Sequence, residues 1–390
     1  MLPRLAPLAR LAPAAPKDVA LDPALPARLD SIVGAALADG MSPGAAVAVA
    51  RWGRVVHSKG YGHTDWNPAA ARVDSSTIYD LASLTKVVAT TTAAMILEEE
   101  GRLALDSAVA FYLPELAASD TAKRYITVRM LLTHRGGFEA YAPLHHTVRG
   151  RESYLAEIAR RPLKSPPGTL AVYSDWDMVL LGLVIERITG RTLDAFAAER
   201  VFRPLGMGDT GFLPDTSSEA LVARIAPTEA DTGAGGLGRG VLRGVVHDGN
   251  AWALGGVSGH AGLFSSLRDL STFAQMLLNG GTYGGTRIVK AETVARWTAP
   301  QDIGSTRAIG WDTPSANSSA GRFFSPRSFG HTGFTGTSMW MDPERGIFVI
   351  ILTNRVNPRG TSERHVRLRR DVADAVQEAV LDAPVVELRP

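Results

Sequence analysis

Cysteine is absent from all 390 residues of the sequence. Disulfide bonds, thiol catalysis and cysteine-ligated zinc are therefore excluded. An excess of charge of one sign is also missing, because 41 lysines and arginines stand against 39 aspartates and glutamates. The resulting net charge of +2 gives no broad basic footprint, so we expect no nucleic-acid partner.

Long apolar runs are missing as well. The longest strongly apolar stretch is Ile347 to Leu352, whereas a membrane-spanning helix needs roughly 20 apolar residues. Four prolines interrupt the apolar character of the first 17 residues. We therefore expect residues 1–20 to form a flexible leader or a trimmed export signal rather than an intact signal peptide, which leaves both a cytoplasmic and an exported location open.

Hydrophobic residues make up 45% of the chain and charged residues 21%, which is typical of a globular protein with a large core. Periodic patterns predict helices at 26–39 and 80–100, a hairpin at 45–58, further helices to about 279, strands at 309–311, 328–331, 337–341 and 347–353, and a closing helix at 363–380.

This order of elements predicts an α/β fold in two lobes. Residues 21–80 and 281–385 would form an α/β lobe, and residues 81–280 would form an inserted, mainly α-helical lobe. The crevice between two such lobes is a natural place for a ligand.

Ser83 and Lys86 lie where a loop turns into a long helical pattern. Residues three apart on a helix share a face, so Lys86 can assist the hydroxyl of Ser83, which is a weak nucleophile on its own. Free N–H groups at a helix N-terminus also favour negative charge. Ser-x-x-Lys alone arises by chance in roughly four of ten chains of this composition, so its role depends on partners elsewhere.

Tyr173 and Asp175 precede another helical pattern. A tyrosine whose phenolate is stabilised by nearby cations can act as a general base for Ser83. The alternatives are a packing role for Tyr173 and a helix N-cap role for Asp175.

A third segment, from Gly330 to Gly336, adjoins a predicted strand and contains His331. Its glycines allow a substrate to approach the strand closely, and its backbone N–H groups are candidate oxyanion donors. The alternative is a glycine-rich turn with a surface histidine.

Together, Ser83-Leu84-Thr85-Lys86, Tyr173-Ser174-Asp175 and His331-Thr332-Gly333 resemble the three motifs of the class C β-lactamase and penicillin-recognising serine hydrolase family. Residues 130–138 and 246–265 resemble further stretches of that family. The resemblance implies an antiparallel sheet flanked by the N- and C-terminal helices, with the helical lobe inserted.

The resemblance also implies roles for individual residues. Ser83 would be the acylated nucleophile, Lys86 would share its proton, and Tyr173 would be the general base. His331 would orient Tyr173 or the substrate, and the N–H groups of Ser83 and Phe334 would form the oxyanion hole. Four residues would contact the substrate: Asp175, Trp176, Thr332 and Gly333. No metal or other cofactor is expected.

Two residues depart from the family pattern. Asp175 stands where asparagine is common, so an acceptor-only carboxylate replaces a donor amide and favours a protonated Lys86. His331 stands where lysine is common, and a histidine is mostly neutral at about pH 7.5. Both changes argue against efficient β-lactamase action.

We therefore expect a serine hydrolase that acts on small acyl esters through an acyl-enzyme. D-Ala-D-Ala carboxypeptidase, D-aminopeptidase or weak β-lactamase activity are alternatives, as is a non-catalytic penicillin-binding sensor. The substrate would be a small ester, amide or β-lactam, and the oligomeric state stays open.

Overall fold

A six-stranded sheet forms the centre of one lobe in the computed structural model, which describes residues 6–118, 120–232, 237–301, 306–315, 318–358 and 363–388. The strand order is β1-β3-β2-β13-β12-β11, and all neighbours are antiparallel except β1 and β3. The strands are β1 (Ala12–Pro13), β2 (Gly44–Arg51), β3 (Arg54–Gly62), β11 (Phe329–Thr332), β12 (Ser338–Asp342) and β13 (Ile347–Thr353). The sheet thus joins both ends of the chain, as predicted, and the α/β fold class is confirmed.

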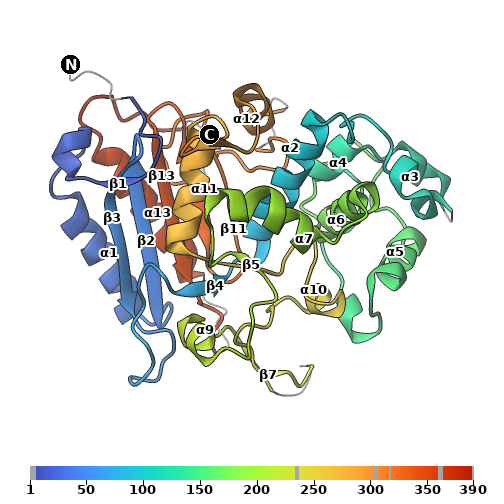
Figure 1. Cartoon of the computed structure of the whole chain (residues 1–390), viewed down its shortest axis with the longest axis horizontal. Coiled ribbons are helices and arrows are strands. Elements are labelled where there is room, and N and C mark those ends of the chain that lie inside the picture. The colour runs from blue at the N-terminus through green and yellow to red at the C-terminus, as the bar shows by residue number, and fades with distance from the viewer. Residues whose placement is uncertain are drawn as a thin grey trace.

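Helices cover both faces of this sheet (Figure 1). On one face lie α1 (Leu25–Ala38) and α13 (Arg364–Glu378), packed against Val49 and Val349, which pair across β2 and β13. On the other face lies α11 (Leu267–Leu278), which shares a core with Ala48 and Ile350. Side chains alternate between faces along a strand, so a continuous apolar run such as β13 fits a strand covered on both sides.

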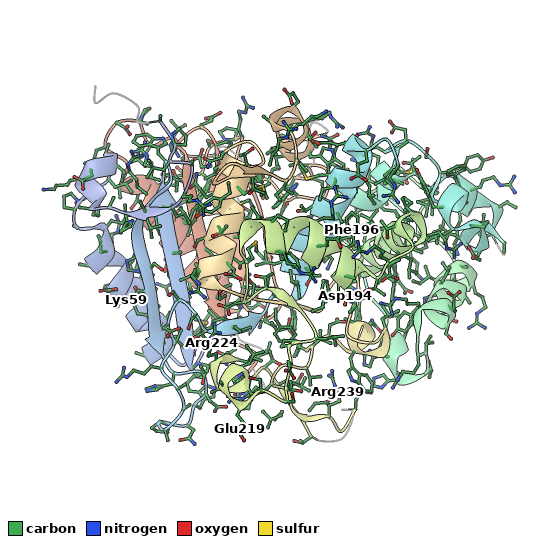
Figure 2. The ribbon with its side chains drawn as sticks, in the orientation of Figure 1. Lys59, Asp194, Phe196, Glu219, Arg224 and Arg239 are labelled. Atoms are coloured by element: carbon green, nitrogen blue, oxygen red, sulfur yellow. The ribbon has the colours of Figure 1, made fainter. Side chains whose placement is uncertain are left out.

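The second lobe is mainly helical (Figure 1). The remaining helices are α2 (Thr92–Glu99), α3 (Val109–Tyr112), α4 (Val128–Leu132), α5 (Arg151–Arg160), α6 (Asp175–Thr189), α7 (Leu193–Ala197), α8 (Arg203–Leu205), α9 (Glu219–Arg224), α10 (Gly249–Ala253) and α12 (Ala291–Thr298). The short strands are β4 (Ile78–Asp80), β5 (Gly211–Phe212), β6 (Ala230–Asp231), β7 (Gly240–Val241), β8 (Leu263–Ser266), β9 (Thr282–Tyr283) and β10 (Thr286–Arg287). Charged side chains such as Lys59 and Glu219 lie at the periphery (Figure 2).

The expected flexible leader is wrong for residues 12–20. Ala12 and Pro13 pair with β3, and a 3₁₀ helix, η1 (Pro16–Val19), follows. Val19 is fully buried in the core under α1 and α13, so apolar burial fixes this segment to the sheet. Residues 1–5 lie outside the described residues.

Two predicted elements also differ. The helix expected at 80–100 is divided into a 3₁₀ turn, η2 (Ala82–Leu84), a π-helical stretch, η3 (Lys86–Thr91), and α2. Residues 309–311 form a bend rather than a strand, because Gly310 has a φ of 80°, outside the extended region. Glycine also fits the close approach there, since a Cβ would lie 2.3 Å from Thr91 Oγ1. In addition, α11 packs on the sheet, so the helical lobe ends before residue 267.

No helix in the described ranges is long and apolar enough to cross a membrane.

Candidate active site

A cavity of about 1220 Å³ brings the three sequence motifs together. Ser83, Tyr173 and Asp175 reach it from the side of the helical lobe, and the segment His331–Phe334 reaches it from the end of β11. The predicted contacts Thr332 and Gly333 line the same cavity. Residues that are 90 to 250 positions apart therefore share one site.

The turn that carries Ser83 is held by a buried carboxylate. Asp80 accepts the N–H of Ala82 at 2.8 Å and the N–H of His247 at 2.7 Å. Ala82 has a φ of 46°, a left-handed conformation that non-glycine residues seldom adopt. The two hydrogen bonds keep the chain in this strained turn, and Ser83 follows directly.

The β11–β12 turn is hydrogen-bonded to the same segment. Thr335 donates to the carbonyl of Asp80 at 2.8 Å, and Thr337 donates to the carbonyl of Leu81 at 3.0 Å. A Cβ on Gly333 would lie only 2.4 Å from the Leu81 oxygen, so glycine is required for this approach. The oxyanion-hole candidates are thereby placed on two segments that are fixed to each other.

Lys86 is the centre of the polar contacts beside Ser83. Its Nζ donates to Ser83 Oγ at 2.8 Å and to the carbonyl of His260 at 3.1 Å, and it pairs with Asp175 Oδ1 at 2.8 Å. The side chain is only 1% exposed. Burial alone would lower the pKa of Lys86, but the carboxylate of Asp175 and the phenol of Tyr173 outweigh it, and the pKa is raised. Lys86 is therefore protonated, in agreement with the expected effect of Asp175.

Tyr173 lies among cationic and aromatic side chains. Lys86 Nζ is 4.9 Å and Arg307 Cζ is 5.3 Å from the centroid of its ring. The rings of His134 and His331 lie at centroid distances of 4.6 and 5.9 Å from the ring of Tyr173. The phenol of Tyr173 thus lies beside two cationic side chains and two imidazole rings, at the entrance to the Ser83–Lys86 pair.

His331 is a neutral, buried histidine. Its Nδ1 donates to the carbonyl of Thr332 at 2.8 Å, which leaves the lone pair of Nε2 as an acceptor. Burial lowers its pKa to about 3, with further lowering by the charges of Lys86 and Arg307. The position therefore carries no positive charge at neutral pH, as expected from the sequence.

Phe334 lines the cavity and is 60% exposed, and its carbonyl accepts from Arg355 Nε at 2.7 Å. Within the described part of the chain, the N–H of Phe334 has no hydrogen-bond acceptor. Its role with Ser83 as an oxyanion donor stays a prediction.

Trp176 does not have the predicted substrate contact. Its side chain is 1% exposed and packs in the helical lobe near the ring of Tyr154. Asp175 and Trp176 are successive residues at the start of α6, and side chains rotate by about 100° per residue on a helix. Because Asp175 faces the cavity, Trp176 is directed into the core.

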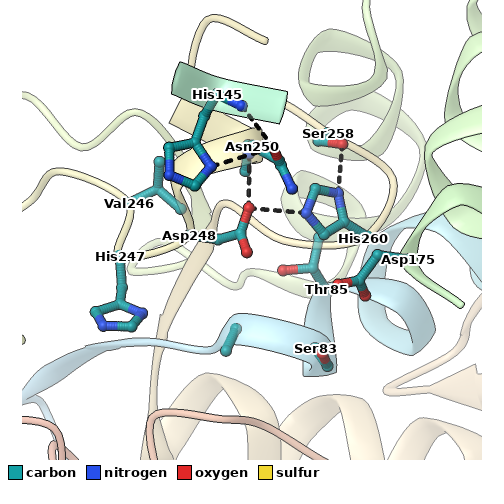
Figure 3. Close-up of polar contacts among 12 residues, drawn as sticks. Ser83, Thr85, His145, Asp175, Val246, His247, Asp248, Asn250, Ser258 and His260 are labelled. Carbon is teal, nitrogen blue, oxygen red and sulfur yellow. Dashed lines mark hydrogen bonds and ion pairs between the residues drawn. The ribbon is translucent and has the colours of Figure 1, made fainter. Parts of the chain in front are cut away.

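Sequence reasoning assigned no role to Asp248 and His260, which line the cavity close to Asp175 (Figure 3). His260 Nε2 lies 2.9 Å from Asp248 Oδ1, and its Nδ1 lies 2.8 Å from Ser258 Oγ. Burial would raise the pKa of Asp248, but the pairing with His260 outweighs it and lowers the pKa. Both residues belong to the stretch 246–265 that resembled the family, which was the available signal.

Asp248 is positioned by α10, because it caps that helix by accepting the N–H of Ala251 at 2.7 Å. Arg239, labelled in Figure 2, supports the preceding residues by donating to the carbonyls of Val246 and His247 at 2.9 and 3.2 Å. This part of the wall is thus held in place by a helix cap and by the hydrogen bonds of Arg239.

Among the described residues, Asp175, Asp248 and His260 form a group whose potential metal-ligand atoms lie within 4.8 Å of one another. The ammonium group of Lys86 is 2.8 Å from Asp175 and would repel a divalent cation. The donor set therefore fits an ion-pair network better than a metal site.

The sequence profile of the Beta-lactamase family matches residues 29–374. A relative from Escherichia coli K12 is 37% identical over 311 residues, which cover 73% of this chain and 70% of the relative. A relative from E. coli O157:H7 is 35% identical over 352 residues, covering 80% of this chain and 78% of the relative. Both carry the provisional name D-alanyl-D-alanine carboxypeptidase.

Solved structures share the fold. EstCE1, described as a hydrolase with promiscuous acyltransferase activity, has a TM-score of 0.72 at 24% identity, covering 91% of this chain and 98% of that one. A penicillin-binding protein homologue from Caulobacter crescentus has a TM-score of 0.70 at 23% identity, with the same coverage. A family VIII carboxylesterase has a TM-score of 0.67 at 23% identity, covering 91% and 97%. The chain belongs to the Beta-lactamase family of serine hydrolases.

Proposed function

We propose that the chain hydrolyses small acyl esters through an acyl-enzyme on Ser83. The observation that carries this proposal is the 2.8 Å contact between Lys86 Nζ and Ser83 Oγ, beside the ring of Tyr173. The ammonium group of Lys86 contacts Ser83 Oγ, Asp175 Oδ1 and the His260 carbonyl, and its raised pKa keeps it protonated. Lys86 is thus a donor in this arrangement, and the base must be another group.

Tyr173 is the group we assign as that base. It takes the proton of Ser83 Oγ while Oγ bonds to the acyl carbon, and it returns the proton to the alcohol that leaves when the ester C–O bond breaks. Water then attacks the acyl-enzyme by the reverse proton path, releasing the acid and restoring Ser83. The N–H groups of Ser83 and Phe334 would stabilise the tetrahedral oxyanion, each contributing roughly 3–4 kcal/mol.

The preference for esters is supported by the two departures from the family pattern. The carboxylate of Asp175 is held by Lys86 and cannot donate to an amide carbonyl of a substrate. His331 is neutral and offers no charge to a substrate carboxylate. An ester needs neither interaction.

A D-Ala-D-Ala carboxypeptidase is the second candidate, and two buried cations favour it. Arg369 donates to the carbonyls of Gly333 and Thr337 at 2.8 and 2.7 Å, and Arg355 donates to that of Phe334. Both arginines line the cavity, so they can supply the positive charge that His331 lacks. The carboxypeptidase names of the E. coli relatives also favour this candidate.

Rates on p-nitrophenyl butyrate, nitrocefin and a D-Ala-D-Ala peptide test the proposal, with Ser83→Ala as the control. We expect kcat/KM to be higher for the ester than for nitrocefin, and Ser83→Ala to lose at least roughly 10³-fold on every substrate. Wild-type rates in Ser83→Ala would refute the acyl-enzyme. A persistent adduct on Ser83 without turnover, seen by mass spectrometry, would instead identify a penicillin-binding sensor.

A further inference from the structure

His134 is hydrogen-bonded to the residue before Tyr173 and to the residue after it. The N–H of Val172 donates to the His134 carbonyl at 2.8 Å, and the N–H of Ser174 donates to His134 Nδ1 at 3.2 Å. Between these two contacts, the rings of His134 and Tyr173 lie 4.6 Å apart with an angle of 46° between their planes. Val172 and Tyr173 lie outside any helix or strand, so these contacts, rather than regular secondary structure, locate the phenol.

His134 is itself held firmly. It follows α4, its N–H donates to the carbonyl of Leu131 at 3.1 Å, and its side chain is 4% exposed. Its φ of 55° is in the left-handed region, where non-glycine residues are uncommon. A residue held in this conformation is a candidate for a functional role.

The ring of His134 is neutral and has a defined tautomer. Because Nδ1 accepts the N–H of Ser174, the ring proton is on Nε2. Burial, together with the charges of Arg307 and Lys86, keeps the pKa of His134 well below its ordinary value. Asp177 Oδ2 lies 3.5 Å from Nδ1, but burial raises the pKa of Asp177 well above its ordinary value, so the contact is not an ion pair.

We propose that His134 is a positioning residue for acylation, which fixes the phenol of Tyr173 for proton transfer from Ser83 without touching the substrate. His134 does not line the cavity, in contrast to Tyr173 and His331. The inference rests on the proposed acyl-enzyme at Ser83. A small displacement of a catalytic group can reduce a rate by roughly 10²-fold, so the loss of this support is measurable.

Two substitutions separate the side chain from the backbone conformation. His134→Asn keeps an acceptor close to the position of Nδ1 and tolerates a positive φ, whereas His134→Gly tolerates the φ but removes both acceptor and ring. With p-nitrophenyl butyrate, we expect His134→Gly to lower kcat about 100-fold with KM within threefold of wild type. We expect the kcat of His134→Asn to be at least tenfold higher than that of His134→Gly.

Asp177→Asn is the matched control, because it changes the same buried cluster while leaving both hydrogen bonds of His134. We expect it to retain kcat within threefold, with thermal unfolding recorded for all three variants. A wild-type kcat in His134→Gly, or an effect confined to KM, would overturn the proposal. So would an equal loss of kcat in Asp177→Asn, because a general disturbance of the cluster would then explain the effect.

The substrate proposal and this inference can fail separately. If the wild type does not turn over esters, the substrate proposal fails. The acylation step is then followed with a fluorophosphonate probe, in which Ser83 Oγ bonds to phosphorus, fluoride leaves and the proton passes to Tyr173. Slower labelling of Ser83 in His134→Gly, with recovery in His134→Asn, supports the inference, and equal labelling rates overturn it.

Discussion

Lys86 Nζ and Asp175 Oδ1 lie 2.8 Å apart, and this ion pair fixes the charge state of the site. Because it raises the pKa of Lys86, the lysine serves as a charged donor to Ser83 rather than as a base. The substitution Asp175→Asn removes the pair and supplies an amide donor. We expect kcat/KM for nitrocefin to rise roughly tenfold, because a donor then faces the substrate carbonyl. An unchanged nitrocefin rate, with ester turnover retained, would show that the polarity of residue 175 does not limit β-lactam use.

The sequence predicted the strand β13 from its continuous apolar run, which is a local pattern, whereas the convergence of Ser83, Tyr173 and His331 was implied by the resemblance of three motifs to a known family. His134 could not be found in the same way. Its function depends on where the chain after α4 crosses the segment before α6, forty residues later. Arg369 lies on the C-terminal helix and reaches the cavity across the carbonyls of Gly333 and Thr337, which are more than thirty residues earlier in the chain. Pairwise contacts between distant segments leave no local pattern.

Two wrong predictions have equally physical causes. Trp176 was assigned to the substrate with its neighbour Asp175, but one step along a helix turns the side chain from cavity to core. Ala12 was assigned to a leader, because a two-residue parallel pairing with β3 leaves no detectable alternation in the sequence.

Gly333 should be sensitive to a single methyl group. A Cβ at this position would lie 2.1 Å from Thr337 Oγ1 and 2.4 Å from the Leu81 oxygen, and would separate the β11–β12 turn from the turn of Ser83. We expect Gly333→Ala to lower ester kcat/KM by about 100-fold, because one oxyanion donor is displaced. Gly208→Ala is the control, since nothing lies within 4 Å of its added Cβ. Equal activity of the two variants would disprove the dependence on this close approach.

His331 should make the fold less stable in acid. Its pKa is about 3 in the folded chain and 6.5 in the unfolded chain, so between these values the unfolded state binds the extra proton. Stability from this residue is present above pH 6.5 and is lost as the pH falls toward 3. His331→Gln lacks this titration, and its stability loss from pH 7.5 to 4.5 should be smaller by about 2–3 kcal/mol. Urea unfolding at the two pH values measures the difference, and parallel losses in both proteins would contradict the burial of a neutral His331.

Arg355 distinguishes the two candidate substrate classes. Its Nε donates to the Phe334 carbonyl, and its guanidinium lies 4.6 Å from the centroid of the Phe334 ring at the cavity wall. If this charge binds the terminal carboxylate of a peptide, Arg355→Gln should raise KM for a D-Ala-D-Ala peptide about tenfold, whereas Arg355→Lys retains most of the affinity. The kcat/KM for the ester should stay within threefold of wild type in both variants, because an uncharged ester has no carboxylate for Arg355 to bind. A wild-type KM for the peptide in Arg355→Gln would remove Arg355 from peptide recognition and leave the ester assignment favoured.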